Sequence, residues 1–205
     1  MNDLAKEKMI VAVDKPDLQS ALQLIDQMTG ELVWAKIGLQ LFTAEGPQVV
    51  REFADRGLRI FLDLKFHDIP NTAKEAIRSA KSLGVAMTTI HLAGGPEMLA
   101  ACSAEAGDMR VLGVSVLTSM DKAALGAIGV AATPPDQVLA IAAMGVASGI
   151  RGVVASPQEI LALRKAHGKP SSLSPRGSDP PARPPAINAV SQPPRPPSGM
   201  GPTIS

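Results

Sequence analysis

Chemically distinctive residues are scarce in this chain of 205 residues, which has one cysteine, three histidines and a net charge of +1. The single cysteine, Cys102, excludes an internal disulfide framework and fits a reducing compartment. Alanines surround it in the pattern of a packed helix, so we expect an inert core thiol. The near-zero charge gives no electrostatic basis for binding nucleic acid or an anionic membrane. Because the histidines lie far apart and the cysteine has no second cysteine, no metal site is predicted.

Long apolar runs are also missing. No run reaches about 18 residues, so no segment is expected to span a membrane. The first eight residues are polar and charged and lack the apolar stretch of a secretory signal, so we expect a cytoplasmic protein. Hydrophobic residues nevertheless make up 45% of the chain, which is ample for the core of one domain.

Strand-like and helix-like segments alternate over residues 9–168, and glycine follows most of the predicted helices. Six such units predict a parallel sheet with right-handed crossovers. The predicted strands are 9–13, 32–37, 59–65, 86–91, 109–115 and 152–155, and the predicted helices are 16–28, 44–56, 71–83, 97–106, 135–148 and 157–167. Polar residues gather after the strands, where (β/α)8 barrels place their active sites. We therefore expect an α/β fold, a (β/α)8 (TIM) barrel that is incomplete.

An incomplete barrel has physical consequences. A closed barrel needs eight strands, so the first and sixth strands should be unpaired edges. The interior apolar side chains should also be exposed on one side, because two βα units that would cover them are missing.

The most informative segment runs from Asp63 to Thr72, with the sequence Asp-Leu-Lys-Phe-His-Asp-Ile-Pro-Asn-Thr. It begins where a predicted strand ends. Alternate residues of a strand share a face, so Asp63 and Lys65 should point the same way. Opposite charges inside an α/β protein are costly unless they line a polar site. The pattern therefore predicts a functional site at this strand end, with a purely structural ion pair as the alternative.

These ten residues resemble the signature of the orotidine 5'-phosphate decarboxylase family, and the resemblance covers residues 9–168. It implies conversion of orotidine 5'-monophosphate to UMP and CO2 in de novo pyrimidine biosynthesis. It also implies that no metal or organic cofactor takes part, because the protein's own charges stabilise the carbanion that forms at C6. The residues implied in catalysis form a charged network in which Lys65 donates the proton; they are Lys36, Asp63, Lys65 and Asp68.

The same resemblance implies a set of substrate-binding residues. Asp14 would bind the ribose hydroxyls, and Thr118 would contact the substrate around the pyrimidine. Asp68, Ile69 and Thr72 match residues that reach into the neighbouring subunit's site, so a homodimer with shared active sites is implied. Lys36 and Asp63 complete this set of residues that contact the substrate.

Two other functions compete with this interpretation. The 3-keto-gulonate 6-phosphate decarboxylases of the same barrel superfamily also use an Asp-x-Lys pair, but with magnesium. Residues 66–72 favour orotidine 5'-monophosphate as the substrate. The second alternative is a catalytically inactive, truncated fragment, which a turnover assay would distinguish.

The composition changes at Lys169, so we divide the chain into a partial barrel domain, 1–168, and a tail, 169–205. The tail holds 11 of the 18 prolines and no Phe, Trp or Glu. It cannot bury enough apolar surface to offset the entropy of ordering, so we expect it to be disordered. The resemblance places the phosphate site after strands seven and eight, where a glutamine, backbone amides and an arginine bind the phosphate. Read in frame, the tail has no counterpart of these phosphate-binding groups.

Translation out of frame from near residue 169 is our interpretation of this tail. Written in GC-rich codons and read from the third base, residues 173–180 can spell Val-Thr-Pro-Gly-Ile-Arg-Pro. This resembles the seventh strand of the same family. Later residues can spell its phosphate loop and the entry to its eighth strand, in family order. A natural proline-rich linker is the alternative.

Overall fold

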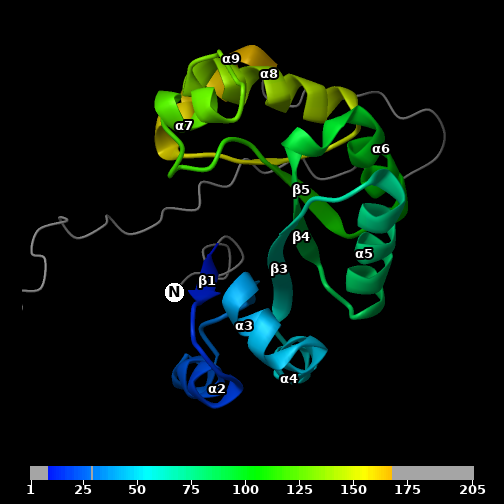
Figure 1. Ribbon diagram of the computed structural model, residues 1–205. Coiled ribbons are helices and arrows are strands. Elements are labelled where there is room, and N and C mark those ends of the chain that lie inside the picture. Colours follow the sequence, from blue (N-terminus) through cyan, green and yellow to red (C-terminus); the bar gives the residue numbers. More distant parts are fainter. Residues whose placement is uncertain (1–8, 29, 168–205) are drawn as a thin grey trace, which may run out of the picture.

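Six parallel strands form the centre of the molecule in a computed structural model that describes residues 9–28 and 30–167. The strands are β1 (Ile10–Val13), β2 (Trp34–Gly38), β3 (Arg59–Phe66), β4 (Met87–His91), β5 (Arg110–Val114) and β6 (Val153–Val154). They pair in chain order, and every pair is parallel. The sheet curves into an open arc with helices around its outside (Figure 1). The fold is α/β, an incomplete (β/α)8 barrel, as predicted.

Helices connect these strands. They are α2 (Leu18–Gln27), α3 (Leu39–Glu45), α4 (Pro47–Asp55), α5 (Pro70–Ser82), α6 (Gly95–Ala106), α7 (Lys122–Ala127), α8 (Pro134–Ala147) and α9 (Pro157–His167), with the 3₁₀ turn η1 (Leu92–Gly94). Local signals start most of them. The Asp17 carboxylate accepts a hydrogen bond of 2.7 Å from the Ser20 backbone at the start of α2. Proline stands in the first turn of α4, α5, α6 and α8.

The helices differ from the sequence prediction in two places. The predicted helix 44–56 corresponds to α4, and a second helix, α3, begins before it at Leu39 and ends where Gly46 adopts a φ of 61°. Helix α7 was not predicted at all. The sixth strand is also shorter than predicted, since only Val153 and Val154 pair with β5. The tail, 169–205, lies outside the described residues.

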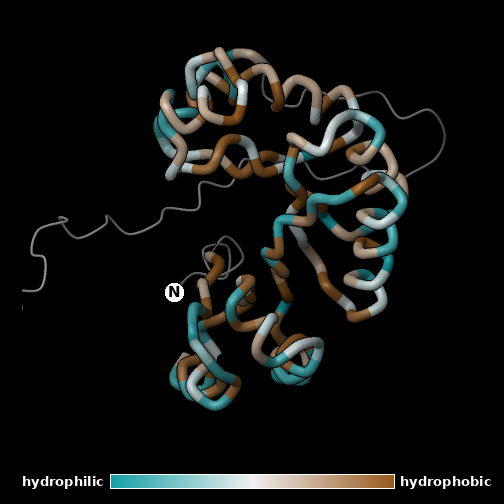
Figure 2. Tube along the Cα trace, viewed as in Figure 1, coloured by the Kyte–Doolittle hydropathy of each residue, from teal (hydrophilic) through white to brown (hydrophobic). Residues whose placement is uncertain are grey.

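Apolar layers lie on both faces of the sheet. Outward-facing residues such as Ile37, Leu62 and Ile90 pack beneath the helices, and Cys102 is fully buried with them. Burial raises the pKa of the Cys102 thiol to about 11, which fits the inert core thiol that we expected. Figure 2 shows apolar residues concentrated along the strands.

The inner face of the sheet has its own apolar cluster. Its members are at most 5% exposed, and they are Trp34, Phe61, Met87 and Leu112. The prediction that the interior layer would be exposed is wrong for these four residues, because they pack against one another and against residues such as Ile10 and Val154. The prediction of two edges is confirmed within the described part of the chain, where β1 pairs only with β2 and β6 only with β5.

The inner face becomes polar toward the carboxyl ends of the strands. Lys36 follows Trp34 by two positions on β2, and Asp63 follows Phe61 by two positions on β3. Because alternate residues share a face, each charged side chain continues the inward column begun by an apolar one. Thr89 has the same inward place on β4. The fold thereby brings polar side chains from separate strands to one edge of the sheet.

Candidate active site

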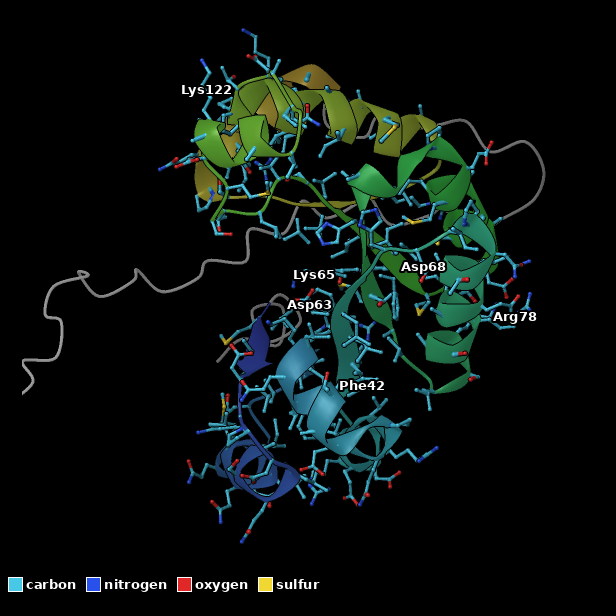
Figure 3. The ribbon with its side chains drawn as sticks, in the orientation of Figure 1. Phe42, Asp63, Lys65, Asp68, Arg78 and Lys122 are labelled. Atoms are coloured by element: carbon cyan, nitrogen blue, oxygen red, sulfur yellow. The ribbon has the colours of Figure 1, made fainter. Side chains whose placement is uncertain are left out.

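An alternating series of carboxylates and ammonium groups lies at this edge. Lys36 Nζ is 3.8 Å from Asp14 Oδ1 and 3.5 Å from Asp63 Oδ2. Lys65 Nζ donates to both carboxylate oxygens of Asp63 at 3.0 Å. Asp14 follows β1 and Lys36 lies on β2. Asp63 and Lys65 lie on β3, where Figure 3 labels them. Four of the predicted site residues thus form one continuous network.

The backbone at Lys65 departs from regular strand geometry. Lys65 has a φ of 53° and is the one non-glycine residue with positive φ among those described. The pairing of β3 with β4 shifts register between Leu62 and Phe66. Asp63 and Lys65 point toward each other on one side of the strand, as predicted, but the strand bulges at Lys65 instead of alternating regularly.

Asp63 is the electrostatic centre of the network, with a side chain that is only 13% exposed. Burial alone would raise the pKa of its carboxyl group. The hydrogen bond and charge of Lys65, the Thr89 hydroxyl and the Lys36 charge outweigh that effect and hold the pKa of Asp63 below its usual range. Asp63 is therefore ionised at neutral pH and keeps two lysines facing it.

Thr89 joins this network, and the sequence analysis did not select it. It is fully buried. Its hydroxyl donates to Asp63 Oδ1 at 2.8 Å and accepts a hydrogen bond of 2.9 Å from the Lys65 backbone amide. The sequence did contain a signal for Thr89. It is a polar residue at an inward position of a predicted buried strand, and that strand neighbours the one that carries Asp63.

The other predicted residues lie on the exposed rim and are not brought to the network within one chain. The Asp68 carboxylate accepts a hydrogen bond of 2.7 Å from the Ile69 backbone amide, and it forms no ion pair among the described residues. Ile69 is 67% exposed. Thr72, in the first turn of α5, and Thr118, after β5, are also exposed. Within one chain, Lys65 therefore contacts Asp63 and not Asp68.

Two histidines border the network. The ring centroids of His67 and His91 are 5.4 Å apart, although the residues are distant in the sequence. Burial, together with the neighbouring His67 and Lys65, lowers the pKa of His91. His91 is therefore neutral at pH 7, at the end of β4 and close to the charged pair.

The described residues contain neither a cluster suited to a metal ion nor a helix suited to crossing a membrane. Over 9–28 and 30–167, no group of three or more His, Cys, Asp or Glu residues is arranged to hold a metal ion. In the same ranges, none of the helices has the length and apolar character needed to cross a membrane.

The arrangement is that of a parallel α/β barrel with paired ionisable groups at the carboxyl edge of its sheet, the edge at which barrel enzymes place their active sites. A family model described as "Orotidine 5'-phosphate decarboxylase / HUMPS family" matches residues 7–180. The chain belongs to this family.

Similar proteins carry related names. The chain is 46% identical over 163 residues to the orotidine 5'-phosphate decarboxylase of Anaeromyxobacter sp. (strain K), a match that covers 79% of this chain and 72% of that protein. It is 45% identical over 170 residues to the orotidine 5'-phosphate decarboxylase of Nitrosospira multiformis, a match that covers 82% of this chain and 70% of that protein. The crystal structure of orotidine 5'-phosphate decarboxylase from Lactobacillus acidophilus matches with a TM-score of 0.71 and 31% identity, over 77% of this chain and 75% of that one.

Proposed function

We propose that this protein is an orotidine 5'-phosphate decarboxylase, which converts orotidine 5'-monophosphate to UMP and CO2 without a cofactor. The observation that carries the proposal is the Lys65 ammonium group, held 3.0 Å from both oxygens of the Asp63 carboxylate at the carboxyl edge of the sheet. The names of the similar proteins support it. The enzyme would catalyse the step of de novo pyrimidine biosynthesis that yields UMP. It would act in the cytoplasm.

The chemistry needs a positive charge and a proton at one carbon atom. When the bond between C6 and the carboxylate breaks, CO2 leaves and the electron pair stays on C6. The ammonium group of Lys65 stabilises that pair and then donates a proton to C6, which gives UMP and leaves a neutral amine. Asp63, ionised at neutral pH, holds Lys65 in place and disfavours the substrate carboxylate beside it. Lys36 keeps Asp63 oriented from the other side.

Binding would use the groups that the network leaves accessible. Asp14 has a side chain that is 70% exposed, so its carboxylate is free to accept hydrogen bonds from ribose hydroxyls. Thr118 lies in the loop after β5, at the same end of the sheet, and would contact the pyrimidine. Such remote contacts supply binding energy that holds the base against Lys65.

We also propose a homodimer with shared sites. Asp68, Ile69 and Thr72 are exposed and do not reach the network of their own chain. A second subunit would receive them at its own Lys65, where a second carboxylate would help to position the ammonium group. An exposed isoleucine beside an exposed carboxylate is well suited to a subunit contact.

The domain division belongs to the same proposal. Residues 1–168 would hold the decarboxylation chemistry, and the phosphate site would be encoded, out of frame, beyond them. A chain with its frame restored after residue 168 should therefore bind the nucleotide more tightly than the present chain.

Release of labelled CO2 from carboxyl-labelled orotidine 5'-monophosphate tests the function. Lys65→Ala should lower turnover about 10⁴-fold or more, because one group supplies both the charge and the proton, and should leave UMP binding nearly unchanged. Lys165→Ala removes an exposed lysine of α9 and should have no effect.

Each outcome has one meaning. Turnover that depends on Lys65 supports the proposal. Turnover only by the frame-restored chain would show that the present chain is an inactive fragment. Near-wild-type turnover by Lys65→Ala would overturn the role of Lys65, and no turnover by either chain would overturn the function.

A further inference from the structure

The hydroxyl of Thr89 lies between the backbone of Lys65 and the side chain of Asp63. It accepts from the Lys65 N–H at 2.9 Å and donates to Asp63 Oδ1 at 2.8 Å. Asp63 in turn accepts from Lys65 Nζ at 3.0 Å. We propose that Thr89 is a positioning residue that fixes the reactive ammonium group of Lys65, an inference that rests on the proposed decarboxylase function.

The backbone at Lys65 needs such a partner. A left-handed φ of 53° is unfavourable for a residue with a side chain and persists only where surrounding contacts impose it. The bulge between Leu62 and Phe66 also removes Lys65 from the regular ladder with β4. A backbone N–H left without a partner in this part-buried position would cost free energy. The Thr89 hydroxyl provides that partner.

One hydroxyl can perform both tasks because a threonine oxygen has one proton to donate and two lone pairs that accept. The proton goes to Asp63 and a lone pair to Lys65. The result is a closed ring of contacts from the Lys65 amide through Thr89 and Asp63 back to Lys65 Nζ. The ring couples the main-chain conformation of the lysine to the place of its ammonium group.

The neighbouring Thr88 shows that burial on β4 does not by itself give this role. Thr88 is also fully buried. Its hydroxyl donates to the Leu62 carbonyl at 2.8 Å, on the opposite face of the strand and away from Lys65. The chain therefore contains a matched control, with the same residue type, strand and burial but no contact with the ring.

The test compares Thr89→Val, Thr89→Ser and Thr88→Val in the full chain. Valine keeps the shape of threonine and removes the hydroxyl, whereas serine keeps the hydroxyl. Loss of a hydrogen bond to a charged group should lower kcat of Thr89→Val about 10- to 100-fold. KM should change little, because substrate contacts remain. Thr89→Ser should recover most of the rate, and Thr88→Val should keep the wild-type kcat.

Two measurements do not depend on turnover. Hydrogen exchange of the Lys65 amide should be about 10-fold faster or more in Thr89→Val than in Thr88→Val. The titration of the Asp63 carboxyl carbon, followed by NMR, should move to higher pH in Thr89→Val and return in Thr89→Ser. The two readouts report the two hydrogen bonds separately.

Wild-type exchange and titration in Thr89→Val would overturn the inference, as would equal losses of kcat in Thr89→Val and Thr88→Val. If neither the wild-type chain nor its frame-restored form turns over orotidine 5'-monophosphate, the proposed function fails. Exchange and titration then still decide whether Thr89 positions Lys65.

Discussion

Replacing Asp63 with asparagine should lower the free energy of unfolding by about 2 kcal/mol at pH 7. The Asp63 side chain is 13% exposed and accepts two hydrogen bonds of 3.0 Å from Lys65 Nζ. Asparagine keeps the shape and one acceptor oxygen but removes the charge. Lys36, also 13% exposed, would retain only Asp14 at 3.8 Å.

The magnitude follows from these contacts. A hydrogen bond to a charged group contributes about 1.5–3 kcal/mol. Lys65 is 36% exposed, so solvent screens its attraction and the lower part of that range applies. Lys36 is more deeply buried, and leaving it poorly compensated adds to the cost. Together these effects give about 2 kcal/mol.

The loss should depend on pH in a defined direction. The pKa of Asp63 in the folded protein lies below the ordinary value of 3.8. The stability that it contributes is therefore complete above about pH 5 and is lost as the pH falls through the folded pKa. The difference between wild type and Asp63→Asn should narrow below about pH 4.

Urea unfolding at several pH values measures this difference. Trp34, the single tryptophan, is 3% exposed in the inner cluster and reports unfolding by its fluorescence. Asp108→Asn, at an exposed carboxylate with no ion pair among the described residues, is the control for the change in net charge. Equal stability of wild type and Asp63→Asn at pH 7, or a gap that does not narrow in acid, would refute the reasoning.

Three further outcomes are expected. Gly113→Ala would bring a Cβ into steric overlap with the Leu92 side chain, so it should lower the free energy of unfolding by about 1–3 kcal/mol through overpacking. Urea unfolding should show a less than additive loss of stability when Gly113→Ala is combined with Leu92→Ala. Mixing Lys65→Ala and Asp68→Ala chains should restore turnover if sites are shared, and no recovery after verified subunit exchange would contradict the dimer proposal. The pKa of His91 in the folded protein lies below 6.5, so as the pH falls the unfolded chain binds this proton before the folded chain does, and the free energy of unfolding should fall below about pH 6.5. In His91→Asn the urea midpoint should depend less steeply on pH, and an unchanged dependence would contradict this reasoning.

Much of the framework could be predicted from the sequence because it depends on local pattern. Alternation of apolar segments with glycine-terminated helices predicted all six strands and their parallel order. The i, i+2 spacing also predicted that Asp63 and Lys65 would point the same way. Helix α7 was missed because it has only six residues, too few for its periodicity to be distinguished from that of a loop.

The geometry of the site required the tertiary structure. Strand alternation places Thr89 on the inner face, but only the register between β3 and β4 decides that its hydroxyl meets Asp63 and Lys65. The left-handed backbone of Lys65 opposes local preference, which reserves that conformation mainly for glycine, so no local signal predicts it. The separation of Asp68 from Lys65 also depends on the path of the loop between β3 and α5. The sequence by itself determined which charges the site contains, because residue spacing along a strand is local. Tertiary structure alone decided which of those charges touch, because contacts between strands depend on register and on the bulge.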